Sequence, residues 1–327
     1  MRRHRLRPSA LLPLLAVVGV WGAVVGQRVD PAPAGAPGAE TTAAAFAFKP
    51  LPFFYDLYSF RGEEGQTDVV AAFAVRAGEL QRERAGSQVQ YRFDVSLVLA
   101  DTALRSVTRT DDSVFVRVPR AFSGRHLLHT HVEVAAAPSR STVQRVIMTD
   151  ATEPGIGQLF GSDFAVPDYS GSDLMLSDVA LGLPGMEEGW DRGTRTLALL
   201  PTSQFPGNAF DVYYEIYNLP PGHAYSTEIS VQDLDDFGEP ATDGRTVNTR
   251  FADESQAGDD GSLPQLRRVD SSLEEGRYRL TVTVTDEVTG DVARNHRDLQ
   301  VREWGRGATL VPAHPASRIR VSQDGNP

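Results

Sequence analysis

The stretch that most constrains the fold of this chain is Phe210–Leu219, with the sequence FDVYYEIYNL. Its even-numbered positions 210 to 216 are aromatic or β-branched, and its odd-numbered positions 211 to 217 are polar or amphipathic. Because side chains of an extended strand alternate between two faces, this pattern predicts a half-buried antiparallel β-strand. The breaker Pro220–Gly222 follows, and a second alternating run covers Tyr225–Val231.

Similar short runs recur along the chain, with almost no periodicity of 3.6 residues. They are Phe53–Tyr58, Asp68–Arg76, Val89–Ala100, Val114–Val118, Leu128–Val134, Leu174–Leu181, Thr196–Leu200 and Tyr278–Thr285. Val292–Val301 has a weaker pattern and is predicted to be an edge strand. Short, closely spaced strands of this kind predict an all-β sandwich or barrel.

The length of 327 residues suits two domains of ordinary size, so we predict two antiparallel β-sandwich modules after a signal peptide and a linker. The expected boundaries are 1–26 for the signal peptide, 27–50 for the flexible linker, 51–150 for the first module, 151–173 for a connector, 174–303 for the second module and 304–327 for a loose tail. Within the second module, Asp233–Gln265 is acidic and is expected to be a mobile, solvated insertion.

The N-terminus has the layout of a signal peptide. Residues 1–9 carry four arginines, and Ala10–Gly26 is an uncharged apolar run that ends in small residues. Cleavage before Gln27 would export the protein to the periplasm or the extracellular space. The alternative is a retained membrane anchor, because 17 apolar residues reach the lower limit for crossing a bilayer.

Composition excludes several classes of protein. The chain has no cysteine, so a disulfide framework, a thiolate metal site and a cysteine nucleophile are excluded. Its formal net charge of −11 disfavours a nucleic acid as partner. Contact with a membrane is expected only through an uncleaved N-terminal segment.

Three pieces of the chain resemble the β-rich part of bacterial proteins that carry a GWxTD domain. They are Phe53–Val75, Leu174–Gly182, and the strand Phe210–Leu219 together with Gly276–Gly290 (GRYRLTVTVTDEVTG). The resemblance implies immunoglobulin-like sandwiches and an exported protein. The motif that names the family is absent, because Gly189-Trp190 continues as Asp191-Arg192-Gly193, so no active site is carried over.

His129 and His131 are the best metal candidates in the sequence. Two residues apart on a strand, they project from the same face, whereas His126 projects from the other. Neutral imidazoles suit Zn²⁺ or Cu²⁺, with Glu133 or a distant residue as third ligand. The competing interpretation is a solvated polar face opposite Leu128 and its apolar neighbours.

A calcium site is the second metal hypothesis. Asp233, Asp235 and Asp236 precede Gly238 as in a calcium loop, since clustered carboxylates supply the oxygen ligands that Ca²⁺ requires. The EF-hand spacing fails after that point, so a solvated acidic loop is the competing interpretation.

Tyr213 and Tyr217 lie on the nominally outward face of the central strand and are the candidate ligand-binding residues, as a platform for sugar or peptide. The alternative is that a loop or the other module covers this face. No serine elbow or H-E-x-x-H motif occurs, so no catalytic residue is nominated.

The sequence as a whole favours an exported, non-enzymatic β-sandwich protein that is an interaction or structural module of the bacterial cell envelope, with an envelope protein or glycan as partner and no cofactor. Two alternatives remain open. One is a carbohydrate- or peptide-binding module that uses exposed tyrosines, and the other is a metal-dependent envelope hydrolase.

Overall fold

The computed structural model describes residues 49–102, 106–186, 188–202, 209–242, 244–258, 261–270, 273–302 and 309–315. These residues form β-strands and two short 3-10 helices, Glu63–Gly65 (η1) and Ala77–Glu79 (η2), which confirms the all-β prediction. No helix within these ranges is long and apolar enough to cross a membrane. The predicted signal peptide and most of the linker lie outside the described residues.

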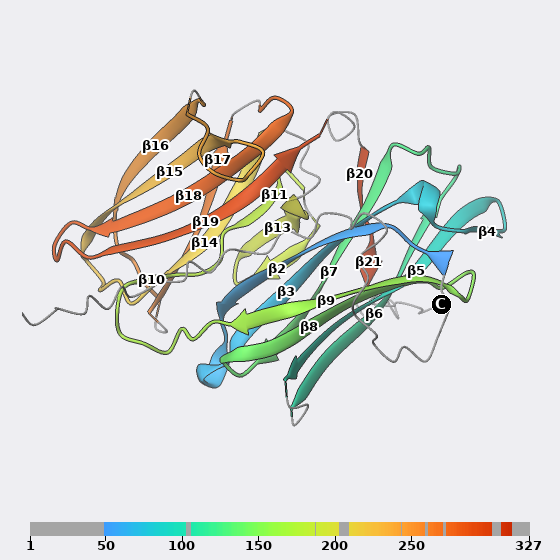
Figure 1. Ribbon diagram of the computed structural model, residues 1–327, viewed down its shortest axis with the longest axis horizontal. Helices are drawn as coiled ribbons and strands as arrows, with labels where there is room; N and C mark the ends of the chain where they lie inside the picture. Colours follow the sequence, from blue (N-terminus) through green and yellow to red (C-terminus); the bar gives the residue numbers. More distant parts are fainter. Residues whose placement is uncertain are drawn as a thin grey trace, which may run out of the picture. The chain divides into compact units, whose positions relative to one another are not determined.

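Two sheets share the first hydrophobic core (Figure 1). The seven-stranded sheet has the order β1-β9-β8-β5-β6-β21, with β4 paired to β5, and the four-stranded sheet has the order β2-β3-β7-β20. Strands of the larger sheet are Lys49–Pro50 (β1), Arg82–Ala85 (β4), Gln88–Asp101 (β5), Val107–Val118 (β6), Ser139–Asp150 (β8), Ile156–Val166 (β9) and His314–Pro315 (β21). Strands of the smaller sheet are Phe53–Arg61 (β2), Thr67–Arg76 (β3), His126–Ala136 (β7) and Thr309–Pro312 (β20).

Two further sheets share the second core. The six-stranded sheet has the order β10-β14-β11-β13-β12, with β17 paired to β14, and the other has the order β16-β15-β18-β19. The first of these contains Met175–Leu176 (β10), Ala180–Leu183 (β11), Trp190–Arg192 (β12), Arg195–Leu199 (β13), Phe210–Tyr217 (β14) and Ser262–Val269 (β17). The second contains Ala224–Leu234 (β15), Thr246–Glu254 (β16), Gly276–Asp286 (β18) and Val292–Val301 (β19).

A third core joins the two pairs of sheets. It consists of Tyr58, Phe60, Val70 and Ala72 from β2 and β3, packed with Ala180, Trp190, Leu197, Leu199 and Tyr213. Strand β3 is therefore apolar on both faces, since its alternate residues Val69, Ala71, Phe73 and Val75 belong to the first core. Burial on both faces explains why its sequence, DVVAAFAV, is a nearly continuous apolar run.

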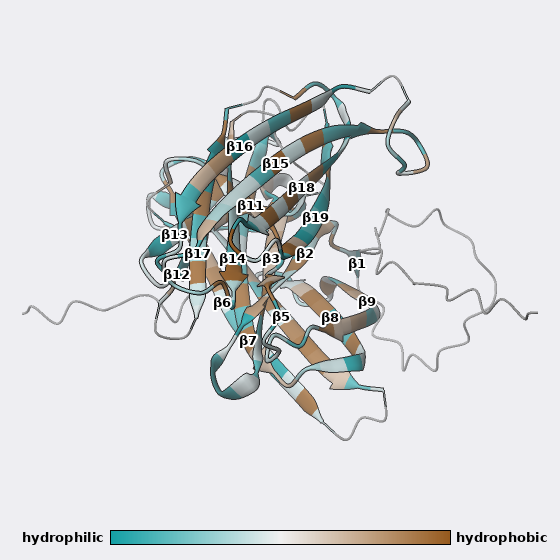
Figure 2. Cartoon of the chain, turned by 90° about the vertical axis from the view of Figure 1, so that its left-hand side faces the viewer, coloured by the Kyte–Doolittle hydropathy of each residue, from teal (hydrophilic) through white to brown (hydrophobic). Residues whose placement is uncertain are grey.

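Strand β14 is the central strand of the second core, as its sequence pattern predicts. Its even-numbered side chains pack in the second core and are fully buried. The strand pairs with β11 and β10 on one edge and with β17 on the other. Hydrophobic segments of β14, like those of β5 and β8, are brown in Figure 2. The predicted edge position of Val292–Val301 is also confirmed, because β19 ends its sheet.

Three segments expected to be irregular contain strands instead. The connector 151–173 includes β9, which pairs with β8 over most of its length. The acidic insertion Asp233–Gln265 includes β16 and the first half of β17, and the tail 304–327 includes β20 and β21. Partner strands pair with these segments, although the segments' own side chains show little apolar alternation.

The last described residues close one edge of the first core. Strand β20 runs parallel to β7 in one sheet, and β21 pairs antiparallel with β6 in the other. Between them, Ala313 is buried in the first core, and its N–H donates to the carbonyl of His129 at 2.9 Å. The division of the chain into two modules stays a prediction.

Candidate functional site

Tyr213 is buried, not exposed as the ligand-binding prediction required. Its ring centroid lies 5.5 Å from that of Trp190, at 88°, and 5.6 Å from that of Phe60. Phe60 comes from β2, so the nominally outward face of β14 is covered by the third core.

Tyr217 is buried as well, two residues further along the same face. Its ring packs 5.1 Å from Tyr169 and lies 4.3 Å from the guanidinium carbon of Arg61, and its hydroxyl accepts the Arg61 backbone N–H at 2.8 Å. The prediction of an exposed tyrosine platform is therefore wrong. The physical reason is that β14 is sandwiched between two layers, which a single strand pattern cannot show.

Both tyrosine hydroxyls donate to the carboxylate of Glu215, which lies between them on the same face. The distances are 2.6 Å from Tyr213 to Oε1 and 2.7 Å from Tyr217 to Oε2. Arg192 donates from Nε to Oε1 at 2.8 Å and from Nη2 to Oε2 at 3.3 Å. Glu215 is 3% exposed, so its charge is compensated inside the protein by one guanidinium and two hydroxyls.

Arg192 also reaches the first pair of sheets. Its Nη1 lies 2.6 Å from Oδ2 of Asp68 on β3, and its Nη2 donates to the backbone carbonyl of Arg61 at 2.5 Å. Glu133 on β7 lies 3.9 Å from the same guanidinium and accepts the indole N–H of Trp190 at 3.0 Å. We call Arg192, Glu215, Asp68, Glu133, Tyr213 and Tyr217 the arginine cluster.

Burial sets the protonation states within the arginine cluster. Burial, and then the neighbouring charge of Glu215, raise the pKa of the Tyr213 and Tyr217 hydroxyls well above the usual range. Burial alone would lower the pKa of Arg192, but Glu215 and Asp68 raise it above its ordinary value. The guanidinium stays charged and the hydroxyls stay protonated at neutral pH, so the cluster acts as a fixed hydrogen-bonded ion network.

A second, half-buried ion network lies beside Tyr58 of the third core. The guanidinium of Arg297 lies 4.6 Å from the Tyr58 ring centroid and donates to the backbone carbonyls of Leu57 and Val179. Asp178 accepts from the backbone N–H of Ser59 and lies 3.7 Å from the same guanidinium. The Arg297 side chain thereby attaches β19 to β2.

The structure places the histidines of β7 as their spacing predicts. His129 and His131 lie on the face opposite the first-core residues Leu128 and Val132, and Glu133 continues that face. His129 is buried, at 4% exposed, and His126 stacks on Phe122 at 4.5 Å between ring centroids. Among the described residues, no group of three or more His, Asp or Glu side chains could hold a metal ion. A zinc or copper site at His129 and His131 stays a prediction.

The acidic residues proposed for calcium form a closed turn. Asp235 Oδ1 accepts the backbone N–H groups of Phe237 and Glu239, both at 2.9 Å. Asp233 Oδ2 accepts the backbone N–H of Arg245 at 2.9 Å. Backbone donors therefore occupy carboxylate oxygens that a calcium loop would direct at the ion.

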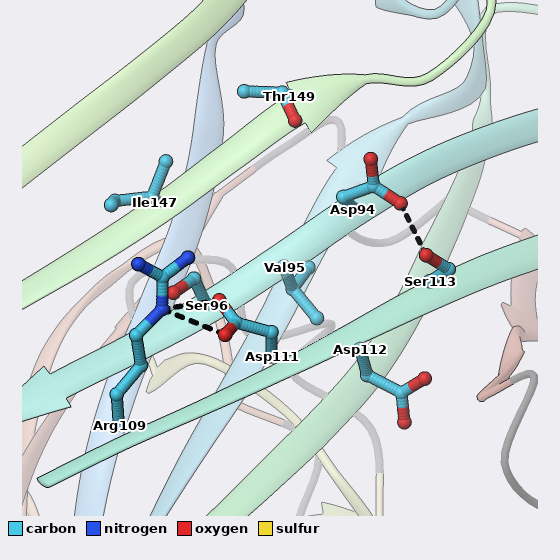
Figure 3. Close-up of a pocket in the computed structure, with 9 residues that line it drawn as sticks. All are labelled: Asp94, Val95, Ser96, Arg109, Asp111, Asp112, Ser113, Ile147 and Thr149. Atoms are coloured by element: carbon cyan, nitrogen blue, oxygen red, sulfur yellow. Dashed lines mark hydrogen bonds and ion pairs between the residues drawn. The ribbon is translucent and has the colours of Figure 1, made fainter.

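A shallow groove of about 520 Å³ lies on the exposed face of the seven-stranded sheet (Figure 3). Ser113 donates to Asp94 at 2.6 Å, and Arg109 Nε binds both oxygens of Asp111 at 2.7 and 2.8 Å. Its lining residues are Asp94, Val95, Ser96, Arg109, Asp111, Asp112, Ser113, Ile147 and Thr149. The arrangement offers hydroxyls and paired charges to a polar ligand. Sequence reasoning missed it, although alternation in Val89–Ala100 places Asp94 and Ser96 on one face.

Comparisons with known proteins identify no family. No protein-family model matches the chain, and no curated protein does. Among solved structures, a red sea bream transglutaminase is 11% identical with a TM-score of 0.21, and the match covers 77% of this chain and 31% of that one. A Bacteroides uniformis β-glucuronidase is 8% identical with a TM-score of 0.25, covering 71% of this chain and 26% of that one. Likeness at this level supports no conclusion about activity, and the GWxTD resemblance stays a prediction.

Proposed function

We propose that this chain is an exported, non-enzymatic β-sandwich protein that serves as an interaction or structural module of the bacterial cell envelope. The observation that carries the proposal is the arginine cluster. Its carboxylates, guanidinium and hydroxyls bind one another and link β3, β7, β12 and β14. They hold the sheets in one arrangement.

A fixed arrangement of sheets is what a binding or structural module needs. Side chains in a preorganised surface lose less conformational entropy when a partner binds. The groove on the seven-stranded sheet is such a surface, because β5, β6 and β8 are paired continuously beneath it. Its partner would be an envelope protein or a glycan, whose polar groups could bind Asp94 and Arg109.

Export is proposed from the N-terminal sequence. Four arginines in residues 1–9, followed by the apolar run Ala10–Gly26, are typical of a signal peptide. A reporter that is active only outside the cytoplasm, fused after residue 48, should become active. Replacing Leu14 and Leu15 with arginine should abolish its activity, and the N-terminus of the exported product should be Gln27. An inactive wild-type fusion would contradict the export proposal.

The binding proposal is tested by capture from the envelope fraction of the source cells. The full chain should retain one protein or glycan in a saturable manner, and Asp94→Ala with Arg109→Ala should weaken retention about tenfold, as expected for loss of about 1.4 kcal/mol. Arg294→Ala, at an exposed position on β19, is the matched control and should bind normally.

Metal analysis of the same protein distinguishes the metal-dependent hydrolase from the non-enzymatic proposal. Stoichiometric zinc, together with a hydrolytic activity that is lost in His129→Ala and His131→Ala, would overturn the non-enzymatic proposal. Unchanged binding by the variants Asp94→Ala and Arg109→Ala would instead show that the interaction surface lies outside the groove.

A further inference from the structure

Strand β16 is an open edge of the sheet β16-β15-β18-β19. It runs for nine residues, TVNTRFADE, and eight of these are exposed. It pairs along its whole length with β15, and among the described residues no strand pairs with its other side. Figure 1 shows it as the outermost strand of this sheet. A long, regular edge of this kind is a template for another strand.

The hydrogen bonds to β15 show which backbone groups of β16 face outward. Just beyond its two ends, Ser255 donates to the carbonyl of His223 at 2.8 Å, and Asp233 donates to the carbonyl of Arg245 at 3.2 Å. Hydrogen-bonded pairs alternate along an antiparallel ladder, so the odd-numbered residues of β16 bind β15. The N–H and C=O groups of the even-numbered residues point away from the sheet. These residues are Thr246, Asn248, Arg250, Ala252 and Glu254.

The opposite edge of the same sheet is covered. Asn295 on β19 donates to the carbonyl of Ser177 at 2.8 Å, and Arg297 donates to that of Val179 at 3.3 Å. Side chains of β19 thus tie this edge to the neighbouring sheet, whereas β16 presents its edge to solvent.

Other long strands at sheet edges are covered or carry features that oppose pairing. On β2, the N–H of Ser59 donates to Asp178 and the carbonyl of Leu57 accepts from Arg297. Strand β17 contains Pro264, which has no N–H to donate. Strand β9 has a register irregularity opposite Ser139 and Thr142, and β1 covers its first two residues. The middle of β6 pairs with β21. Strand β16 has no proline, glycine or register irregularity.

We propose that β16 pairs with β16 of a second copy of this chain, antiparallel and in register around Thr249, so that two four-stranded sheets become one continuous sheet. The two-fold axis places Thr249 opposite its symmetry mate. A two-fold interface uses the same surface from both copies, so one strand supplies both sides. The inference does not depend on the proposed function.

This register makes the strand complementary to itself. Counting outward from Thr249, Val247 of each copy lies opposite Phe251 of the other, and Arg245 lies opposite Asp253. The interface therefore contains two apolar pairs and two pairs of opposite charge, which stabilise antiparallel sheets. In each charged pair, Asp253 also binds Arg267 of its own chain at 2.6 Å. Moving the axis one residue towards the C-terminus would place Arg250 opposite Arg250, which like-charge repulsion disfavours.

Backbone pairing supplies the rest of the interface. In this register the outward-facing residues Asn248 and Arg250 lie opposite each other, as do Thr246 and Ala252. Each such narrow pair exchanges two hydrogen bonds, giving about eight across the dimer. The side chain of Val247, which is 48% exposed in the single chain, would also be covered in the dimer.

The absence of cysteine allows a direct test of the register. Thr249 lies in a wide, non-hydrogen-bonded pair of the new interface, with a Cα–Cα distance of about 4.5 Å to its mate, which falls within the range for disulfides. Thr249→Cys in the full chain should form a disulfide-linked dimer under mild oxidation, seen as a band of doubled mass on a non-reducing gel.

Ala252→Cys is the matched control on the same strand. In the proposed register its mate lies about 20 Å away along the strands, so it should cross-link at least about tenfold more slowly than Thr249→Cys, which benefits from a high local thiol concentration. Equal rates for the two variants would mean random collision and would overturn the register.

Sedimentation of the cysteine-free chain tests the dimer itself. The measured mass should rise from that of one chain towards that of two as the protein concentration increases. Asn248→Pro should stay monomeric, because the Asn248 N–H that it removes faces outward and is not bound by β15. Asn248→Ala should still dimerise. Arg245→Asp, which leaves the intrachain pair of Asp253 with Arg267 intact, should weaken the dimer. A wild-type chain that stays monomeric at all concentrations would overturn the proposal.

Discussion

Arg192 and Glu215 form a two-point ion pair inside the protein, with Nε 2.8 Å from Oε1 and Nη2 3.3 Å from Oε2. Arg192 ends the short strand β12, and Glu215 lies within β14. The same guanidinium binds Asp68 on β3 at 2.6 Å. One side chain therefore joins the six-stranded sheet to the four-stranded sheet that contains β3.

Removing the cation from this pair should be strongly destabilising. Arg192→Met would leave Glu215 buried without a counter-charge, and breaking a buried ion pair costs about 3–5 kcal/mol. The free energy of unfolding, measured in urea, should fall by that amount. Adding Glu215→Gln should recover part of the loss, because the uncompensated charge is then absent.

The exposed pair Arg109–Asp111 provides the control for that experiment. Its two side chains are 59% and 50% exposed, so water already solvates both charges. Arg109→Met should leave the free energy of unfolding nearly unchanged. A similar loss for both arginine variants would contradict the role assigned to the arginine cluster.

The hydroxyls of Tyr213 and Tyr217 should each contribute to stability through Glu215. A hydrogen bond to a charged group contributes about 1.5–3 kcal/mol, so Tyr213→Phe and Tyr217→Phe should each lower the free energy of unfolding by that amount. In a double-mutant cycle, Tyr213→Phe should cost less when Glu215 is replaced by glutamine. Costs that do not depend on Glu215 would show that the hydroxyls act elsewhere.

Alkaline pH should unfold the protein before these tyrosines ionise. Burial raises the pKa of Tyr213, Tyr217 and Tyr58 above the ordinary value of 10.0. The unfolded state therefore loses these protons first, so their contribution is complete below pH 10.0 and is lost as the pH rises above it. Absorbance of ionised tyrosine should rise in step with the loss of β-sheet circular dichroism.

Acid should weaken the turn between β18 and β19. Burial opposes ionisation of Asp286, but the pKa of this carboxyl is held below its ordinary 3.8 by His223, whose Nδ1 lies 2.8 Å from Oδ2, and by the backbone N–H groups of Val288 and Thr289. A lowered pKa means that this stabilisation is present above pH 3.8 and is lost as the pH falls through the folded value. Asp286→Asn should flatten the acid limb of a plot of unfolding free energy against pH. If the acid part of this plot is the same for Asp286→Asn as for the wild type, other carboxyls cause the acid unfolding.

Gly189 is required for the close approach of β12 to β13. A Cβ at this position would lie 2.6 Å from the carbonyl carbon of Leu197 and 2.8 Å from the backbone nitrogen of Ala198, and neither can move without the strand. Gly189→Ala should cost at least about 1–3 kcal/mol, the usual range for overpacking, and should shift the near-ultraviolet circular dichroism of Trp190. Gly124→Ala, with open space around its Cβ, should be neutral.

The role of the Gly189-Trp190 dipeptide could be predicted from the sequence only in part. In the sequence, Gly189-Trp190 is only an incomplete family motif. In the structure, Gly189 permits close strand packing and Trp190 stacks on Phe60 with ring centroids 4.8 Å apart. Nothing in the order of residues indicates that β2 lies against β12, since the two segments are separated by more than 120 positions.

The arginine cluster was predictable only in part. Alternation on a strand places Tyr213, Glu215 and Tyr217 on one face, and that much follows from sequence. Arg192 and Asp68 come from other strands, and neither has a local signal that pairs it with Glu215. The histidine face of β7 followed from the same alternation, whereas the burial of His129 did not.

The sequence by itself determined the all-β class, the central role of Phe210–Leu219 and the edge position of Val292–Val301, because side-chain alternation is a local property of an extended chain. Tertiary structure alone decided what covers each face and which polar segments become strands. Pairing with β8 and β15 makes strands of β9 and β16 whatever their side chains. Packing of β2 and β3 against β14 buries Tyr213, which had been predicted to lie on a binding surface. Both effects depend on residues distant in sequence.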